Sequence, residues 1–405
     1  MLWKLGTLRE TWKAQHRYSN ESDQFIMLDS CMTGSGIRLP SGRSQLYKAF
    51  RLVLFLSTSL RWSTFLLNFS KWGSYGAALN NLHVLTAVLV TLVRGIWIQM
   101  NIKEFTEAKS YINGRRFRPN DGRSTEIRRE TYQQIHLLVT VYLIAQATAY
   151  APLMVIDLRR IPPLRNPIEV RDMTSDGFQL FLDKLYAVML LPYGASAVTN
   201  VLTTYMLLEG FIVEMQIIAN SFGEIFDSIA NQPEDDFWRE LQANFKICAE
   251  QHITCLNYLK NTRPLLNGTL LVVYFSTGFF ISTGAVYIMW TKKLEMFKFQ
   301  IFYLIAFNVL ECFFFSILVE RIKRVHNSVG EQVYNLTWHT NLRYNKAFEK
   351  DYIAIRETML IVMHSAERPL GISCGGLFEL GMERFYEMMK LSYQLVMFLW
   401  NVADD

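Results

Sequence analysis

The side chains of this sequence that could perform chemistry are few and do not assemble into a catalytic or metal-binding motif. The sequence contains no HExxH, GxGxxG or Walker-type GxxxxGK[ST] pattern, and its seven histidines lack the spacing of a metal site. The five cysteines, Cys31, Cys248, Cys255, Cys312 and Cys374, form no CxxC pair and so indicate neither a zinc site nor a disulfide framework. We therefore expect no enzyme, no catalytic residues, no metal and no cofactor.

Two polar side chains inside long apolar stretches are candidates for ligand binding. His83 and Gln146 each lie in a stretch that has no charged residue. An unpaired polar group in apolar surroundings is costly, so each side chain needs a partner. That partner is either a bound ligand or a polar group on a neighbouring helix, and the sequence leaves both interpretations open.

The stretches that carry these residues are long enough to cross a bilayer as helices. Four windows contain no Asp, Glu, Lys or Arg, and three more are similar but contain charge; the hydrocarbon core needs about 20 apolar helical residues. The seven predicted spans are Gln45–Asn68 with Arg61, Trp72–Val93, Thr131–Ile156, Leu185–Leu208, Pro264–Thr291, Phe297–Val319 with Glu311, and Leu377–Trp400. Because open strands leave unpaired amides in lipid and the windows lack the alternation of a porin, we predict an all-α integral membrane protein.

The distribution of basic residues predicts the orientation of these spans. Lys and Arg mark the cytoplasmic side, and the segments on the side of the amino terminus carry about three times as many as those opposite. We expect the amino terminus inside and the carboxyl terminus outside. The first 45 residues show no apolar core with a small-residue cleavage site, so we also expect the amino terminus to be retained.

Four regions follow from this layout. Residues 1–44 form a cytoplasmic amino-terminal segment, 45–320 hold six transmembrane helices with long cytoplasmic loops, 321–367 form cytoplasmic anchor helices, and 368–405 hold the last helix and an extracellular tail. In the anchor region, Ala347–Glu367 reads as an amphipathic helix, because its apolar residues recur every three or four positions. These residues are Phe348, Tyr352, Ile355, Met359 and Met363.

The last span combines an apolar face with charges. Phe385, Met389, Ser392, Val396 and Leu399 or Trp400 recur at helical spacing along one face. Its inner part contains Glu379, Glu383, Arg384 and Lys390. Charges inside a bilayer are costly and usually face protein or water. Either these residues line a water-filled path or they lie at the level of the lipid headgroups.

The carboxyl-terminal segment resembles the insect odorant receptor family. The resemblance rests on Arg368-Pro369-Leu370, on Gly375-Gly376-Leu377-Phe378 and on the run from Phe385 to Tyr393, FYEMMKLSY, together with length and layout of spans. The chain is more similar to a ligand-tuned receptor than to the shared co-receptor, since the loop between the fourth and fifth spans lacks the long insertion of that subunit.

This resemblance implies a ligand-gated, non-selective cation channel in the plasma membrane of a sensory neuron. The chain would be the odorant-binding subunit of a heterotetramer with the odorant receptor co-receptor. It would contact membrane lipid, bind a small volatile apolar ligand and pass monovalent and divalent cations, with no nucleic-acid partner.

The resemblance also implies positions for the pore and the pocket. The pore and gate would map to Ser392, Val396, Leu399 and Trp400. Apolar groups at the last two positions would favour dewetting of a pore built from this chain alone, so we expect the co-receptor to be required. A pocket between the outer halves of the second, third, fourth and sixth spans would include His83, Gln146, Tyr150, Tyr193, Tyr303 and Phe307, unless these side chains simply pack the helices together.

Other classes of membrane protein fit the sequence less well. A gustatory receptor would share the fold, but its Thr-Tyr-hydrophobic-hydrophobic-hydrophobic-Gln-Phe ending is not reproduced at Ser392 to Phe398. A G-protein-coupled receptor has its amino terminus outside, against the charge distribution, and carries Asp-Arg-Tyr and Asn-Pro-x-x-Tyr motifs that this chain lacks. A transporter would show a repeated half or paired broken helices, and neither is apparent.

Overall fold

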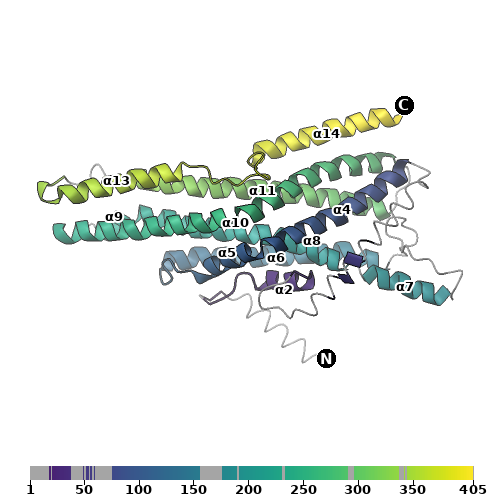
Figure 1. The fold of residues 1–405 in the computed structure, drawn as a ribbon, viewed down its shortest axis with the longest axis horizontal. Helices are drawn as coiled ribbons and strands as arrows, with labels where there is room; N and C mark the ends of the chain where they lie inside the picture. The colour runs from purple at the N-terminus through teal and green to yellow at the C-terminus, as the bar shows by residue number, and fades with distance from the viewer. Residues whose placement is uncertain are drawn as a thin grey trace, which may run out of the picture.

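The fold is an elongated bundle of helices, seen here in a computed structural model (Figure 1). The structure describes residues 18–19, 21–37, 49, 52–53, 55–56, 59, 75–155, 176–188, 191–229, 233–290, 296–336, 342 and 344–404. Within these residues every regular element is a helix, and one isolated bridge joins Cys374 to Phe378. The prediction of an all-α protein is therefore confirmed.

Most predicted spans coincide with helices. The helices are α2 (Ile26–Gly34), α4 (Tyr75–Met100), α5 (Ile102–Gly114), α6 (Gly122–Val155), α7 (Asp176–Val188), α8 (Leu191–Gly223), α9 (Ile225–Ile229), α10 (Glu234–Trp290), α11 (Met296–Tyr334), η4 (Lys346–Phe348), α13 (Glu349–Ala366) and α14 (Met382–Asp404). The second, third, fifth, sixth and seventh predicted spans fall on α4, α6, α10, α11 and α14, whereas the fourth, Leu185–Leu208, begins in α7 and continues in α8. The first, Gln45–Asn68, lies almost wholly outside the described residues.

Three helices of the described part are long and apolar enough to cross a bilayer. They are Gly194–Gly223 in α8, Asp236–Met289 in α10 and Ile301–Tyr334 in α11. Leu85–Met100 and Ile102–Gly114, from α4 and α5, pass the same criterion together, with a bend of 69° between them. At about 1.5 Å per residue α10 is about 85 Å long, far more than the roughly 30 Å of a hydrocarbon core, so α10 must extend well beyond one face of the membrane.

α10 runs without interruption through Pro264, where the sequence predicts the fifth span to begin. A proline inside a helix removes a backbone hydrogen bond and tends to kink the helix. Trp97 of α4 packs on this turn: its Nε1–H donates to the carbonyl oxygen of Pro264 at 3.0 Å, and Gly268 lies directly beneath the indole ring. The predicted fifth span is therefore continuous with the helical residues that precede Pro264 in α10.

α8 is the central helix of the bundle. It packs against α11, α10, α6, α2 and α4, and every residue from 206 to 215 is buried. Two carboxylates in this buried run each pair with an arginine of another helix. Glu209 binds Arg321 of α11, and Glu214 binds Arg128 of α6, both with N–O distances of 2.8 Å. Opposite charges thus satisfy the acidic residues that interrupt the apolar helix.

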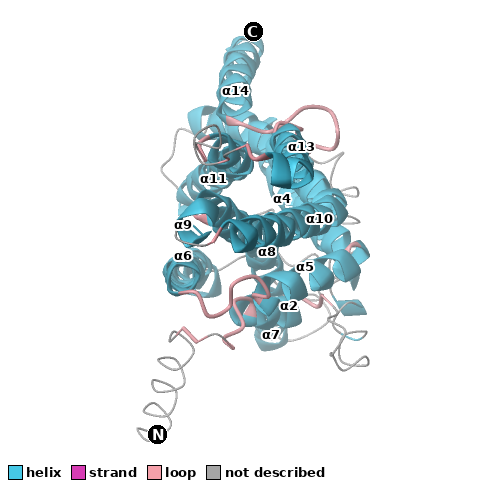
Figure 2. Cartoon of the chain, turned by 90° about the vertical axis from the view of Figure 1, so that its left-hand side faces the viewer, coloured by secondary structure: helices cyan, strands magenta, loops and turns pink. Residues whose placement is uncertain are grey.

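The amphipathic helix predicted over Ala347–Glu367 is present as η4 and α13. Ile355 and Met359 on its apolar face are buried, and α13 packs against α11 and α10. Figure 2, which looks along the bundle from this end, shows α13 beside both helices. We call the end of the bundle formed by α9, α13 and the adjoining parts of α10 and α11 the anchor end.

The sequence predicts that the last helix begins at Leu377, but in the structure it begins at Met382. Gly371, Gly375 and Gly376 have φ angles of +66°, +61° and +83°, in the left-handed region that glycine adopts at little cost. The N–H of Cys374 also donates to the carbonyl oxygen of Phe378 at 2.7 Å. These turns hold the linker out of the helical conformation, and α14 then runs along the edge of the bundle against α10 and α11 (Figure 1).

Candidate functional site

His83 is a buried polar side chain between α4 and α10. Its ring is 1% exposed, and its Nδ1 lies 3.1 Å from the hydroxyl oxygen of Thr283 on α10. The ring also meets Phe280 edge-to-face, with centroids 5.0 Å apart. Nε2 has no hydrogen-bond partner within the described part of the chain. The interhelical hydrogen bond considered from the sequence is therefore present, but it uses only one of the two ring nitrogens.

A second cluster joins α11 to α6. The hydroxyl of Tyr303 donates to the carbonyl oxygen of Ala145 at 3.2 Å. Phe307 stacks on Tyr303 with centroids 6.2 Å apart and meets Tyr142 at 5.3 Å. Gln146, next to Ala145 in α6, is buried. Aromatic surfaces and a few polar groups are the lining that a small apolar ligand requires.

The two clusters lie at the same level of the bundle. Thr283 is followed by Gly284, where an added Cβ would lie 2.4 Å from Ile305 and 3.1 Å from Ile301 of α11. Ile301 and Ile305 flank Tyr303 in sequence. A continuous layer of contacts thus runs from α4 through α10 and α11 to α6, on the side of the bundle away from the anchor end.

The structure places four of the six predicted pocket side chains. It brings Tyr303 and Phe307 together against α6, buries Gln146 in α6 next to Ala145, and puts His83 at the α4–α10 contact. Tyr150 and Tyr193 belong to α6 and α8, but their side chains lie outside the described part. Sequence reasoning missed Tyr142, Phe280 and Thr283, because an aromatic or hydroxyl residue in an apolar helix does not reveal the helix that it faces.

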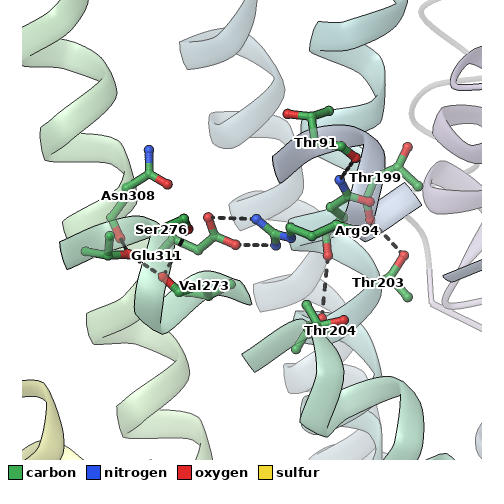
Figure 3. A network of polar contacts seen from close by, with 12 residues as sticks. Thr91, Arg94, Thr199, Thr203, Thr204, Val273, Ser276, Asn308 and Glu311 are labelled. Carbon is green, nitrogen blue, oxygen red and sulfur yellow. Dashed lines mark hydrogen bonds and ion pairs between the residues drawn. The ribbon is translucent and has the colours of Figure 1, made fainter. Parts of the chain in front are cut away.

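A buried ion pair between Arg94 and Glu311 joins α4 to α11 (Figure 3). Nη1 and Nη2 of Arg94 each donate to one carboxylate oxygen of Glu311. The distance from Nη1 to Oε2 is 3.2 Å. The side chains are only 5% and 2% exposed. Arg94 thus balances the charge of Glu311, which the predicted sixth span contains, and the sequence does not show that Arg94 is its partner.

Hydroxyl and amide groups surround this ion pair. Thr277 of α10 donates to the carbonyl oxygens of Val273 at 2.7 Å and of Asn308, on α11, at 3.2 Å. On the other side of Arg94, the amide of Asn200 on α8 donates to the carbonyl oxygen of Thr91 at 3.1 Å. These contacts tie α4, α8, α10 and α11 together in one polar layer.

Contrary to the expectation that the sequence contains no nucleophile motif, Gly371-Ile372-Ser373-Cys374-Gly375 matches the GxSxG pattern of a hydrolase nucleophile. That motif requires a sharp turn from a strand into a helix, whereas this segment links α13 to α14. Asn267 of α10 accepts the N–H of Ser373 at 2.9 Å, and the Ser373 hydroxyl accepts the N–H of Gly376 at 3.0 Å. The serine therefore holds the linker on α10, and its context is not that of a nucleophile.

One face of α14 is packed inside the chain. Ser392 is 3% exposed and lies against Gly278 of α10, where an added Cβ would be 3.5 Å from its hydroxyl oxygen. Val396 and Trp400, further along, are half-buried, and the side chain of Leu399 lies outside the described part. The opposite face is exposed over large apolar side chains, namely Tyr386, Leu391, Tyr393, Leu395, Met397 and Phe398.

The charges at the beginning of α14 meet charges of α11. Glu379 binds Lys323 at 2.6 Å, and the N–H of Met382 donates to the carboxylate of Glu320 at 2.7 Å. Glu320 and Lys323 directly follow Val319, the predicted inner end of the sixth span. This geometry favours the headgroup level for these charges over a position deep in the membrane.

A pair of buried histidines lies at the anchor end. His252 of α10 and His326 of α11 have ring centroids 5.6 Å apart, and Nε2–H of His326 donates to the carbonyl oxygen of Arg368 at 3.1 Å. Burial, with a smaller contribution from His326, lowers the pKa of His252 to about 4. Burial also lowers the pKa of His326. Both imidazoles are therefore neutral at physiological pH, just where the chain leaves α13 for the last helix.

The sequence of this chain is similar to those of known receptors. The family model described as 7tm Odorant receptor matches residues 74–393. Odorant receptor 22b of Drosophila melanogaster is 21% identical over 173 residues, and odorant receptor 22a of the same species is 23% identical over 179 residues. Each alignment covers 42% of this chain and only 40% of the relative.

Solved structures share the fold at low sequence identity. The insect olfactory receptor OR5 of Machilis hrabei, in complex with eugenol, superposes with a TM-score of 0.66 and 15% identity. A second structure of OR5 gives a TM-score of 0.68, also at 15% identity. Both comparisons cover 94% of this chain and 100% of the other, so the likeness extends over the whole arrangement of helices.

Proposed function

This chain belongs to the 7tm odorant receptor family, and we propose that it is the odorant-binding subunit of a ligand-gated, non-selective cation channel. It acts in the plasma membrane of a sensory neuron, as a heterotetramer with the odorant receptor co-receptor. The observation that carries the proposal is the family match over residues 74–393, which includes both candidate clusters and the first half of α14. This membership replaces the gustatory-receptor and G-protein-coupled alternatives.

The contacts of α10 support a route from ligand to pore. α10 carries Thr283, which binds His83, and Gly278, which packs against Ser392 of the last helix. These two positions are about one and a half helical turns apart. A ligand that moves α10 relative to α4 or α11 therefore also moves the surface on which α14 rests, and the pore opens or closes with it.

The pore assignment changes in one respect. Val396, Leu399 and Trp400 remain our proposed pore and gate positions, near the end of α14. Ser392 is buried against Gly278 within the chain, so we assign it to helix packing rather than to the ion path. The exposed face of α14 is apolar and therefore suits contact with lipid or with a neighbouring subunit.

Current recording tests the proposal directly. Cells would express this chain alone, the co-receptor alone or both, while a panel of volatile compounds is applied at fixed voltage. We expect a fast inward current only when both are present, with a reversal potential near zero, as expected for a pore that does not select among cations. A response that needs a G protein and carries no fast current would refute the channel assignment.

A cysteine pair tests the pore positions. Val396→Cys and Ser392→Cys would each be expressed with the co-receptor and treated from outside with a charged thiol reagent during ligand application. We expect the reagent to change the current of V396C and to leave that of S392C unchanged, since Ser392 is covered by α10. Equal modification of both, or of S392C alone, would show that the ion path reaches Ser392 and that α10 does not cover it in the channel.

A further inference from the structure

The hydrogen-bonding pattern around His83 determines which of its nitrogens carries the proton. The hydroxyl of Thr283 donates its single hydrogen to the carbonyl oxygen of Phe279 at 2.8 Å. In the 3.1 Å contact with His83, the Thr283 oxygen must therefore be the acceptor, so Nδ1 of His83 carries the hydrogen and donates it. In the neutral imidazole the other nitrogen, Nε2, is then a hydrogen-bond acceptor.

The imidazole is neutral because nothing near it could balance a positive charge. In the described part of the chain, no carboxylate forms a hydrogen bond or ion pair with His83, and its ring is 1% exposed. A second proton would place an unpaired charge among apolar side chains, which is strongly unfavourable. Nε2 thus remains an acceptor, and the described residues give it no donor.

The acceptor lies in the layer of the bundle that also contains the pocket side chains, on the side of the imidazole ring away from Thr283. Nδ1 points to α10, and the two ring nitrogens point in divergent directions, so Nε2 points away from Thr283. The layer that contains Thr283 continues through Gly284 and Ile305 to Tyr303. A buried acceptor without a donor is rare and costly in a folded protein. It is, however, the group that a ligand with an O–H or N–H would satisfy.

We propose that the ligands of this receptor are small apolar alcohols or phenols that donate a hydrogen bond to Nε2 of His83. The inference rests on the proposed function and adds a chemical class to it. Ethers, ketones and hydrocarbons of the same size fill the same apolar space but leave Nε2 unpaired. One neutral hydrogen bond together with the relief of a buried unpaired acceptor corresponds to about a tenfold difference in potency.

Pairs of isomeric alcohols and ethers separate the effect of the ligand's O–H donor from the effect of its size. The probes are 1-octanol with heptyl methyl ether, and 2-phenylethanol with benzyl methyl ether, applied to cells that express this chain with the co-receptor. We expect at least one alcohol to activate at about tenfold lower concentration than its ether. Equal potency within every active pair would overturn the proposal while leaving the channel function intact. No current with any volatile compound in a broad panel would overturn both.

Three variants assign the difference to His83. His83→Phe keeps a ring but removes the acceptor. The difference in potency between an alcohol and its isomeric ether, called the gap below, should therefore close, and it should close because the alcohol alone loses potency. His83→Gln offers a side-chain oxygen as acceptor and should retain part of the gap. Thr283→Val removes the oxygen that fixes the proton on Nδ1, so Nε2 carries the proton part of the time and the gap should narrow.

Surface labelling of each variant controls for folding. If His83→Phe reaches the surface and weakens alcohol and ether equally, His83 only packs the helices and the proposal is wrong. If His83→Phe does not reach the surface, Thr283→Val decides the question, because valine has the shape of threonine. An unchanged gap in that variant would overturn the assignment of the acceptor.

Discussion

Arg94 of α4 and Glu311 of α11, 217 residues apart in the chain, form an ion pair that solvent hardly reaches. Both carboxylate oxygens accept from the guanidinium (Figure 3). Such a pair is not a large source of stability, because both ions lose their hydration on folding. Its importance lies in the cost of breaking it, since the remaining charge would then be buried without a partner.

Removing one member of this pair should prevent folding. Glu311→Gln or Arg94→Met should each cost about 3–5 kcal/mol and sharply reduce the amount of monodisperse protein in fluorescence-detected size-exclusion chromatography. The double variant Arg94→Met/Glu311→Met leaves no buried charge and should recover much of the loss. Single variants with wild-type yield would mean that solvent or lipid headgroups reach the ion pair.

The bidentate pair between Arg128 and Glu214 should not tolerate lysine. Nε and Nη2 of Arg128 each donate to the carboxylate at 2.8 Å, and Nη2 also donates to the carbonyl oxygen of Phe117. Lysine cannot reproduce this fork, so Arg128→Lys should lower the melting temperature of the purified protein by several degrees. The control is Arg321→Lys, whose side chain is 45% exposed beside Glu209 and should have a small effect. Equal shifts for both would contradict the role of geometry.

Gly268 should not accept a side chain. A Cβ there would lie 2.1 Å from Nε1 of Trp97, so Gly268→Ala should destabilise the protein by about 1–3 kcal/mol through overpacking. The effect is read from the melting temperature. Gly34→Ala, at a position with open space around it, is the matched control. Adding Trp97→Phe to Gly268→Ala should relieve part of the strain; a fully additive double variant would show that the two residues do not compete for space.

Acid should destabilise the anchor end through His252 and His326. Histidine in an unfolded chain titrates near pH 6.5, whereas burial lowers the pKa of His252 to about 4 and also lowers that of His326. Above about pH 7.5 both residues are almost wholly neutral in either state and contribute little pH dependence. As the pH falls below that value, the unfolded chain binds protons that the folded chain does not, so stability decreases by at most about 1.4 kcal/mol per pH unit for each histidine.

The melting temperature at pH 7.5 and 5.5 checks this expectation. The difference between the two values should be smaller in His252→Gln than in the wild type. His364→Gln, at an exposed position of α13, should keep the wild-type difference. If His252→Gln has the same difference as the wild type, other groups cause the acid sensitivity.

Much of the fold follows from the sequence, because a bilayer disfavours charged side chains at every position of a spanning helix and requires each backbone hydrogen bond to be made within the protein. A window without charges that is about 20 residues long has few alternatives to a membrane helix, and the windows on α8, α10 and α11 indeed form long apolar helices. The sequence does not show where the linker before α14 ends and the helix begins. Leu377 looks apolar enough for a helix, but the left-handed turns at Gly375 and Gly376 delay the helix to Met382.

The sequence by itself determined the helical class, the apolar windows, the family resemblance at the carboxyl terminus and the polar residues that needed partners. Only the tertiary structure decided what those partners are: Arg94 for Glu311, Thr283 for His83 and Gly278 for Ser392. The physical reason is that helical periodicity shows which residues share a face, whereas packing between distant segments selects the neighbour of that face. The same packing left Nε2 of His83 as an acceptor without a donor.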